Sequence, residues 1–286
     1  MDLPEPREPL RVRLDVTLDQ QAALLDAVQR AGQLLLTTWP GNPRQPTTRL
    51  ASSRKPDGSL VTDADRASEQ LLTQAITRSF PGARLIAEED QSTHARTNGT
   101  LWFLDPLDGT RQYLDGSPDF AILLSAWTNG RPQLSVAALP AEDILAIAHQ
   151  DRARIQRPSS PDQLAQPPVH AVYCDPPGLR EALPAGTDYR IDAYEAARVL
   201  IDLASGLAAA AVIEMCGQLA WDIAPLLHLV TATGGTITDE TGREVRLVST
   251  LVPARHLVAA RTPDLHRILL DSLGLKLQPG PADAPR

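Results

Sequence analysis

The sequence predicts an α/β protein, with helices and sheets stacked in layers (an α+β layered arrangement). Three observations lead to this expectation. Near the start, residues 17–39 and 67–80 repeat apolar side chains at helical spacing. Three apolar runs within 121–149 are separated by turn signals that are typical of antiparallel strands. After residue 169, strand-like and helix-like runs alternate, as they do in an α/β unit.

Capping and turn signals set the limits of these elements. Thr17-x-x-Gln20 has the form of a capping box, and Trp39-Pro40-Gly41 marks the end of the first helix. Asn129-Gly130 predicts a tight hairpin turn, and Gly234-Gly235 predicts a glycine cap after a helix. The elements expected in chain order are a helix at 17–39, a loop at 42–53, a turn at 55–58, a helix at 67–80, strands at 84–87, 101–104, 121–127, 133–138, 144–149 and 169–174, a helix at 194–207, a strand at 208–213, a helix at 221–233, a hairpin at 236–248, a strand at 256–260 and a helix at 263–273.

The stretch with the most specific chemistry is Leu101-Trp-Phe-Leu-Asp-Pro-Leu-Asp-Gly-Thr110. Its four apolar residues predict a buried strand, which we expect to stop at Asp105-Pro106 because proline has no N–H to donate. Asp105 and Asp108 then place two carboxylates beside the Leu107 carbonyl, and oxygen ligands of this kind suit Mg²⁺. The backbone N–H groups of the next two residues are able to hold an anion. Metal-assisted phosphate chemistry needs such a pair of sites, although an ordinary strand-ending turn uses the same residue types.

Three further acidic residues stand where an element begins or ends. Asp65 lies at a helix start, Glu88 follows a predicted strand, and Asp222 stands at the start of a later helix. Each has a structural interpretation, because acidic residues favour helix N-termini and exposed turns. Together with Asp105 and Asp108 they form an oxygen-rich set without histidine, which indicates two or more Mg²⁺ ions rather than zinc.

Composition and charge exclude several classes of protein. The 286 residues are 43% hydrophobic and 22% charged, as in ordinary globular proteins. The net charge of −8 argues against nucleic acid as the main partner, but not against a small phosphate ester. Cys174 and Cys216 are too few for a disulfide framework or a four-sulfur zinc site, which leaves one disulfide or two free thiols. The apolar run 203–213 is too short to span a membrane, and residues 1–9 lack the form of a signal peptide, so we expect a cytoplasmic protein without a membrane partner.

A proline-rich stretch predicts a division into two domains. Residues 152–168 contain four prolines and are the best candidate linker. We expect an N-terminal α+β domain at 1–151, which carries most of the acidic residues, and a C-terminal α/β domain at 169–286, which contributes Asp222.

Three motifs, in order, resemble those of the inositol monophosphatase family. Ala87-Glu88-Glu89 is similar to the family's Gly-Glu-Glu, Asp105-Pro-Leu-Asp-Gly-Thr110 to Asp-Pro-(Ile/Leu)-Asp-Gly-Thr, and Trp221-Asp222-Ile-Ala224 to Trp-Asp-x-Ala. Lys55-x-Asp-Gly-Ser-Leu-Val-Thr-x-Ala-Asp65 matches the segment before the first motif, and the similarity covers about 17–260. The resemblance implies an αβαβα sandwich of alternating helix and sheet layers. It also implies a Mg²⁺-dependent, lithium-sensitive phosphatase.

The resemblance further implies a role for each of these residues. The ligands of two Mg²⁺ ions per chain, with a third ion within reach of Glu88, would be Glu88, Asp105, the Leu107 carbonyl, Asp108 and Asp222. Asp65 and Thr110 would form the catalytic pair that activates water. The N–H groups of Gly109 and Thr110 would bind the phosphate. Contacts to the substrate would come from Glu214, Asp108 and Asp222.

The segments that select the substrate depart from the family pattern. Nothing in 150–168 resembles the family's Gly-x-Gly-Ala-x-x-Asn-Gly hairpin, and Asp192-Ala-Tyr-Glu195 replaces its Gly-Ser segment. Asp192 or Glu195 is either a substitute contact that repels an extra phosphate or only a charge at a helix start. The second interpretation is the one we expect.

The leading functional hypothesis is a phosphomonoesterase for a small polyol or sugar phosphate of the inositol 1-phosphate type. The alternatives within the family are a 3′(2′),5′-bisphosphate nucleotidase, for which Arg111-Gln-Tyr113 is suggestive, a histidinol-phosphate phosphatase and a fructose bisphosphatase. A non-catalytic protein that binds metal or phosphate for regulation is the alternative from another class. The resemblance also implies a homodimer, because the family is often dimeric.

Overall fold

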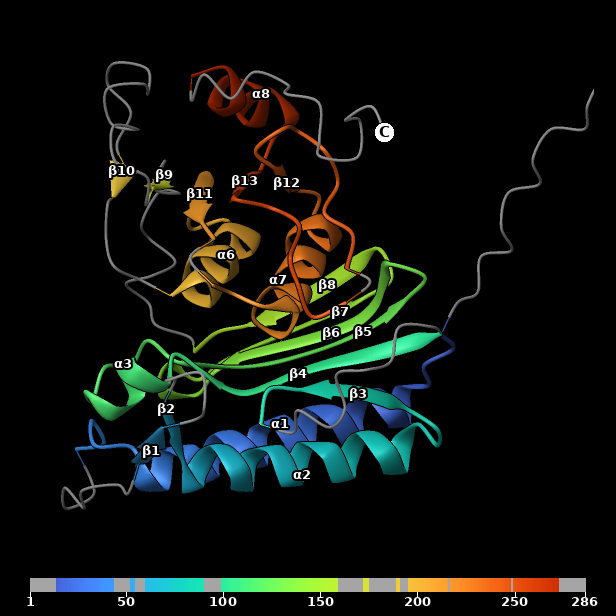
Figure 1. Cartoon of the computed structure of the whole chain (residues 1–286), viewed down its shortest axis with the longest axis vertical. Helices are drawn as coiled ribbons and strands as arrows, with labels where there is room; N and C mark the ends of the chain where they lie inside the picture. Colours follow the sequence, from blue (N-terminus) through green and yellow to red (C-terminus); the bar gives the residue numbers. More distant parts are fainter. Residues whose placement is uncertain are drawn as a thin grey trace, which may run out of the picture.

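The computed structural model describes residues 14–43, 52–54, 60–89, 99–158, 172–174, 189–190, 195–215, 217–247 and 249–272. In this part of the chain, helices and sheets alternate in five layers, as Figure 1 shows. Helices α1 and α2 form one outer layer, and a six-stranded sheet lies on them. Helices α6 and α7 separate that sheet from a five-stranded sheet, and α8 covers the other side. The expected α/β fold with alternating layers is confirmed.

The first layer consists of two amphipathic helices with complete N-terminal caps. Helix α1 spans Leu18–Thr38, and Thr17 and Gln20 form the predicted capping box. Helix α2 spans Asp63–Ser79 and begins with a second capping box, in which Thr62 is the N-cap and Asp65 the third helical residue. Each cap satisfies N–H groups that a helix start leaves without a partner. The second cap also fixes the position of Asp65.

The six-stranded sheet has its strands in the order β3-β4-β5-β6-β7-β8. Strands β3 and β4 are parallel, and the remaining neighbours are antiparallel. Asn129 and Gly130 both have positive φ in the turn between β5 and β6, as the Asn-Gly pair predicts. The bounds of the strands are Arg84–Ala87, Thr100–Asp108, Ala121–Thr128, Arg131–Leu139, Ile144–His149 and Arg152–Gln156.

The predicted end of the central strand at Asp105-Pro106 is wrong. Strand β4 continues to Asp108, with a register shift against β5 between Asp105 and Asp108. A bulge interrupts the ladder of hydrogen bonds, so Pro106, which has no N–H, stands where no donor is required. Both aspartates keep a partner on β5, Leu123 for Asp105 and Ala121 for Asp108, so the bulge lies between them at one end of the strand.

The sheet is covered on both faces, and its side chains alternate between two cores. From β4, Trp102 and Leu104 pack with α1 and α2, whereas Leu101 and Phe103 pack with α6 and α7. This arrangement explains why the strand reads as a continuous apolar run rather than as an alternating pattern. The second core also includes the five-stranded sheet, so both halves of the chain contribute to it.

The five-stranded sheet has the order β10-β9-β11-β13-β12. Its strands are Tyr189–Arg190, Val172–Cys174, Ala210–Glu214, His256–Ala260 and Thr236–Asp239. The helices around it are α6 at Ala196–Ser205, α7 at Ala220–Ala232 and α8 at Pro263–Ser272. Gly234 has positive φ just after α7, in agreement with the predicted glycine cap.

The predicted hairpin at 236–248 is wrong in its second strand. Strand β12 pairs with β13, and residues 243–247 form no strand. The Asp239 side chain accepts hydrogen bonds from the N–H groups of Thr241 and Arg243. Backbone hydrogen bonds from the N–H of Asp239 to the Arg243 carbonyl and from the N–H of Gly242 to the Asp239 carbonyl also close this local turn, so it does not need a paired strand after it.

Two loop predictions also change. Residues 152–156 form β8 rather than the start of a linker, because β7 supplies them with a hydrogen-bonding partner. The predicted loop at 42–53 runs into β1 at Ser52–Arg54, which pairs with β2 at Leu60–Thr62. The predicted turn at 55–58 and most of the proposed linker lie outside the described residues. The division into two domains remains a prediction.

None of the described helices is both long and apolar enough to cross a membrane.

Candidate active site

Three aspartates from two layers meet at the β4 bulge. Asp105 and Asp108 come from β4, and Asp222 comes from the first turn of α7. One carboxylate oxygen from each lies within 4.8 Å of those of the other two. The N–H of Leu219 donates to Oδ2 of Asp222 at 2.7 Å, which fixes this carboxylate at the helix start. The structure therefore brings these three carboxylates together, although Asp105 and Asp222 are 117 residues apart in the sequence.

Burial and mutual repulsion raise the pKa of each aspartate in this cluster. The pKa of Asp105 is raised well above its usual value by burial, and then by the charges of Glu88, Asp108 and Asp222. Burial is also the main cause for Asp108, followed by the charges of Glu195 and Asp222. Burial raises the pKa of Asp222 to about 7, although the hydrogen bond from Leu219 acts in the opposite direction. A bound cation would relieve this repulsion.

Glu88 belongs to the same electrostatic cluster. Its N–H donates to the carbonyl of Leu104 at 3.0 Å, which continues the pairing of β3 with β4 and places Glu88 beside the bulge. The Glu88 charge raises the pKa of Asp65, Asp105 and Asp222. The order of the strands in the sheet, not proximity in the sequence, brings Glu88 to this position.

Thr110 and Asp65 form a hydrogen-bonded pair next to the cluster. The Thr110 hydroxyl lies 3.3 Å from Oδ1 of Asp65 and 3.1 Å from the carbonyl of Leu107, and it can donate to either. The other oxygen of Asp65 accepts hydrogen bonds from the N–H and the hydroxyl of Thr62. Asp65 is fully buried, and burial is the main cause of its raised pKa. The Ser68 hydroxyl of α2 donates to the carbonyl of Pro106 at 3.0 Å and holds α2 against the bulge.

Gly109 is the turn between the bulge and helix α3, which spans Thr110–Leu114. It has a φ of +79°, a conformation that is costly for any residue with a side chain. A Cβ atom at this position would lie 2.9 Å from the carbonyl oxygen of Asp119 and 3.3 Å from Cγ of Glu195. Only glycine fits both this backbone conformation and this close approach.

The structure describes two of the candidate substrate contacts. Glu214 ends β11, where it pairs with His256 of β13. Glu195 stands at the start of α6, as the sequence suggested, and its side chain also lies against Gly109. Asp192 lies outside the described residues.

Sequence reasoning did not identify two residues that support this region. The N–H of Glu195 donates to Oδ2 of the buried Asp119 at 2.8 Å. Arg198, one turn later in α6, lies with Nε 3.6 Å from the other Asp119 oxygen and also pairs with Glu142. The spacing of Glu195 and Arg198 on one helical turn was the only local signal, since Asp119 comes from a distant loop.

The buried histidine of α7, His228, forms hydrogen bonds with the six-stranded sheet and the turn after β7. The Nδ1 atom of His228 lies 2.8 Å from the Ser135 hydroxyl, and its Nε2 lies 2.7 Å from the carbonyl of Gln150. Since a carbonyl only accepts, Nε2 carries the proton and Nδ1 accepts from Ser135. Burial lowers the pKa of His228 to about 4. This imidazole therefore links α7 to the six-stranded sheet in its neutral form.

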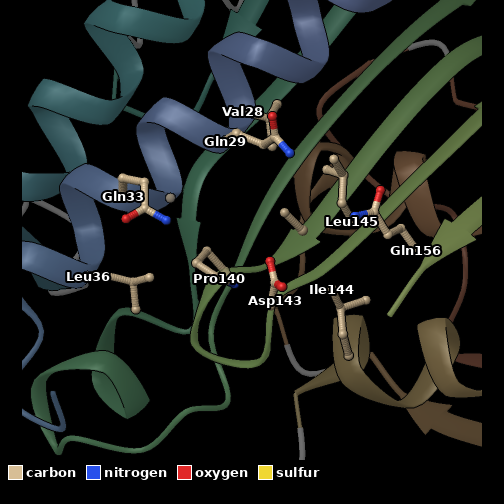
Figure 2. Close-up of a pocket in the computed structure, with 11 residues that line it drawn as sticks. Val28, Gln29, Gln33, Leu36, Pro140, Asp143, Ile144, Leu145 and Gln156 are labelled. Carbon is tan, nitrogen blue, oxygen red and sulfur yellow. The ribbon is translucent and has the colours of Figure 1, made fainter. Parts of the chain in front are cut away.

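A separate hollow of about 130 Å³ lies between α1 and the ends of β6, β7 and β8. Figure 2 shows Gln29 and Gln33 on one side of this hollow, and Asp143 and Gln156 on the other. Asp143 is the only carboxylate in its lining, and none of the predicted site residues lines it. The hollow has no grouping of carboxylates comparable with that at the β4 bulge.

Comparison with known proteins shows which families and structures this chain resembles. The model of the inositol monophosphatase family matches residues 18–274. The histidinol-phosphatase of Chlorobaculum parvum is 28% identical over 273 residues, which cover 91% of this chain and 98% of the relative. The histidinol-phosphatase of Mycobacterium tuberculosis is 31% identical over 214 residues, which cover 68% of this chain and 79% of the relative. The solved structure of Thermotoga maritima IMPase shares the fold, with a TM-score of 0.69 at 22% identity, over 90% of this chain and 99% of the other.

Proposed function

This chain belongs to the inositol monophosphatase family and is a phosphoric monoester hydrolase, and from this premise we propose that it hydrolyses a small phosphate monoester with Mg²⁺ bound at the carboxylate cluster. The observation that carries the proposal is the convergence of Asp105, Asp108 and Asp222 beside the pair formed by Thr110 and Asp65. Magnesium dependence and lithium sensitivity are typical of the family.

The donor set fits Mg²⁺. It contains only oxygen atoms, Asp105 is buried with Asp108 and Asp222 partly exposed, and its charges all have the same sign. Hard divalent cations bind such groups, and the soft or nitrogen ligands that favour zinc are missing from the group of three. The ligands that we propose, for two Mg²⁺ ions with a third within reach of Glu88, are Glu88, Asp105, the Leu107 carbonyl, Asp108 and Asp222. When bound, Mg²⁺ would neutralise charge on the phosphate and lower the pKa of a coordinated water.

The protein's own contribution to the attack would come from Thr110 and Asp65. The Thr110 hydroxyl has one proton and two possible acceptors, Oδ1 of Asp65 and the carbonyl of Leu107. If the Leu107 carbonyl binds a metal ion, Oδ1 of Asp65 is the acceptor that remains. A lone pair of the Thr110 oxygen then orients the attacking water, and Asp65 accepts the proton through the hydroxyl. A raised pKa makes Asp65 a stronger base than an exposed aspartate, and the bonds from Thr62 hold it in one orientation.

The phosphate would bind at the turn after the bulge. The left-handed conformation of Gly109 lets the chain turn directly into α3, so the N–H groups of Gly109 and Thr110 are candidates to donate to phosphate oxygens. Positioning and charge neutralisation would supply most of the rate enhancement, as is usual for phosphoryl transfer. The further contacts with substrate that we proposed from the resemblance are Glu214, Asp108 and Asp222.

Two classes of substrate are consistent with this site. A small polyol phosphate such as inositol 1-phosphate is the type substrate that the family name indicates. Histidinol phosphate is the second candidate, because two relatives are named histidinol-phosphatases. The relative from Chlorobaculum parvum aligns with this chain over nearly all of the relative's length. Fructose 1,6-bisphosphate and adenosine 3′,5′-bisphosphate each carry a second phosphate and are the comparison substrates.

The test is release of inorganic phosphate from these four esters, with Mg²⁺ or with a chelator. We expect turnover only with Mg²⁺, and loss of it in an Asp105→Asn variant, which keeps the shape of the side chain but removes a charge. Asp264→Asn, at an exposed position, is the matched control and should retain full activity. Phosphate release that persists in the chelator or in the Asp105 variant would contradict the proposed site. No release from any ester, with Mg²⁺ binding intact, would support a regulatory binding protein instead.

A further inference from the structure

Glu195 stands at the start of helix α6 without capping it. It is the N-cap residue, but its carboxylate accepts no hydrogen bond from the first turn of the helix. Its backbone is fixed instead by the hydrogen bond from its N–H to Asp119, at 2.8 Å. The side chain is half-buried. A charge that only stabilised the helix would be expected to face the free N–H groups of the first turn.

A buried network holds Glu195 in this position. Asp119 accepts from the Glu195 N–H with one oxygen and lies 3.6 Å from Nε of Arg198 with the other. The guanidinium of Arg198 also pairs with Glu142, at the 3₁₀ turn after β6. Arg198 and Asp119 have about a tenth of their side-chain surfaces exposed, so this anchor is largely desolvated and rigid. The start of α6 is thus tied to the sheet that carries the candidate active site.

The Glu195 side chain lies beside the proposed phosphate-binding turn. Its Cγ would be only 3.3 Å from a Cβ built on Gly109. After burial, the Glu195 charge is the largest influence that raises the pKa of Asp108. Glu195 is therefore close enough to face whatever group is attached to a phosphate bound at Gly109.

Among the residues that the structure describes, no basic side chain balances this carboxylate. Arg198 is directed to Asp119 and Glu142, and within the described residues no basic side chain forms an ion pair with Glu195. Its neighbour Asp119 is itself acidic, and the pKa of Glu195 is raised by burial and by that charge. A partly desolvated carboxylate with acidic neighbours is costly unless a ligand supplies positive charge.

We propose that Glu195 determines specificity for the leaving group of the ester, by binding an ammonium group on it and by disfavouring a second phosphate. This inference rests on the proposed function and names its substrate class as phosphate monoesters of amino alcohols. The phosphate would be held at the turn of Gly109, and the ammonium would pair with Glu195. An ester with a second phosphate near Glu195 would meet like charge instead.

Two esters that differ in one group provide the test. Serinol phosphate and glycerol 1-phosphate have the same carbon skeleton, and the first carries an ammonium where the second carries a hydroxyl. We would measure kcat/KM for both with the wild type, with Glu195→Gln and with Glu244→Gln. Glu244 is exposed and pairs with Arg246, so its variant makes the same change in net charge on a distant surface. The phosphonate analogues of both esters, titrated by calorimetry in Mg²⁺, give a measure of binding that does not depend on turnover.

We expect Glu195→Gln to lower kcat/KM for serinol phosphate roughly tenfold or more. The change in kcat/KM for glycerol 1-phosphate should be much smaller. The affinity for the amino phosphonate should fall by a similar factor, and hydrolysis of fructose 1,6-bisphosphate should improve. Glu244→Gln should change none of these values.

Two outcomes would overturn the inference. In the first, Glu195→Gln leaves the ratio of the two esters and of the two phosphonates unchanged. In the second, it raises the Mg²⁺ requirement equally for both esters, which would assign Glu195 to the metal rather than to the leaving group. Failure of the proposed function would look different, because the wild type would then release no phosphate from any ester. The ratio of the affinities for the two phosphonates, measured by calorimetry, would still decide the role of Glu195.

Discussion

Replacing Asp222 with asparagine should stabilise the metal-free protein at pH 8 and abolish its phosphatase activity. The carboxylate of Asp222 is buried among Asp105, Asp108 and Glu88, and its pKa is raised to about 7, so at pH 8 it is ionised at a cost. Asparagine removes this charge without changing the size of the side chain. It keeps an oxygen that can accept the hydrogen bond from the N–H of Leu219.

The size of the effect follows from the shift in pKa. A change from 3.8 to about 7 corresponds to roughly 4 kcal/mol of destabilisation above pH 7, at about 1.4 kcal/mol for each unit. The pKa of about 7 already includes the favourable hydrogen bond from the N–H of Leu219 to the charged form. The gain of roughly 4 kcal/mol corresponds to a rise in Tm of about 8 °C or more for a chain of this size.

The sign of the pH dependence is specific. An acid whose pKa is raised in the folded state costs nothing below its unfolded value of 3.8, and its cost grows as the pH rises to about 7. The advantage of Asp222→Asn should therefore be largest at pH 8 and much smaller at pH 5, because the carboxyl of the folded protein is already protonated at pH 5. Saturating Mg²⁺ should reverse the order, because only the wild type retains the full ligand set.

The assay is thermal unfolding in a chelator at both pH values, followed by the same scans with Mg²⁺. Asp264→Asn is the matched control, since Asp264 also lies in the first turn of a helix but is exposed. It should change Tm little at either pH. An Asp222→Asn variant that is less stable than the wild type in the chelator at pH 8, or equally stabilised at pH 5, would refute the argument from repulsion.

Three further predictions test other parts of the site and core. Thr110→Val should lower kcat roughly 100-fold with little change in Tm, whereas Thr110→Ser should keep most activity because its hydroxyl still reaches Asp65; an active valine variant in the same phosphate assay would exclude this hydroxyl from the chemistry. Gly109→Ala should cost roughly 1–3 kcal/mol in denaturant unfolding and most of the activity, since its φ is +79° and the new Cβ would meet the Asp119 carbonyl; unchanged stability would show that the turn relaxes. The imidazole of His228 should remain neutral in NMR titrations until about pH 4, so its contribution to stability is complete above pH 6.5 and is lost as the pH falls toward 4; titration near 6.5 would contradict its burial.

Much of the fold followed from local signals. The capping box at Thr17 and the Asn129-Gly130 turn are determined by residues within four positions of each other, and both predictions are confirmed. The errors share one cause, which is that strand pairing depends on a distant partner. Polar and apolar residues alternate in 152–156, and this segment forms a strand because it pairs with β7. Residues 243–247 follow a good turn but form no strand, because β13 is the partner of β12.

For the site, the sequence alone identified the carboxylates that we propose as metal ligands and the turn that we propose as the phosphate site. The motif of residues 105–110 accounts for two of these aspartates and for the turn, because its aspartates, proline and glycine each have a local physical role. Only the tertiary structure decided which carboxylates meet. Asp222 joins Asp105 and Asp108 because α7 packs on the sheet. Asp65 lies next to this cluster because its capping box holds it within reach of the Thr110 hydroxyl. The position of Glu195 beside Gly109 depends on the buried pair of Asp119 and Arg198, which are far apart in sequence, and no local pattern reports such a contact.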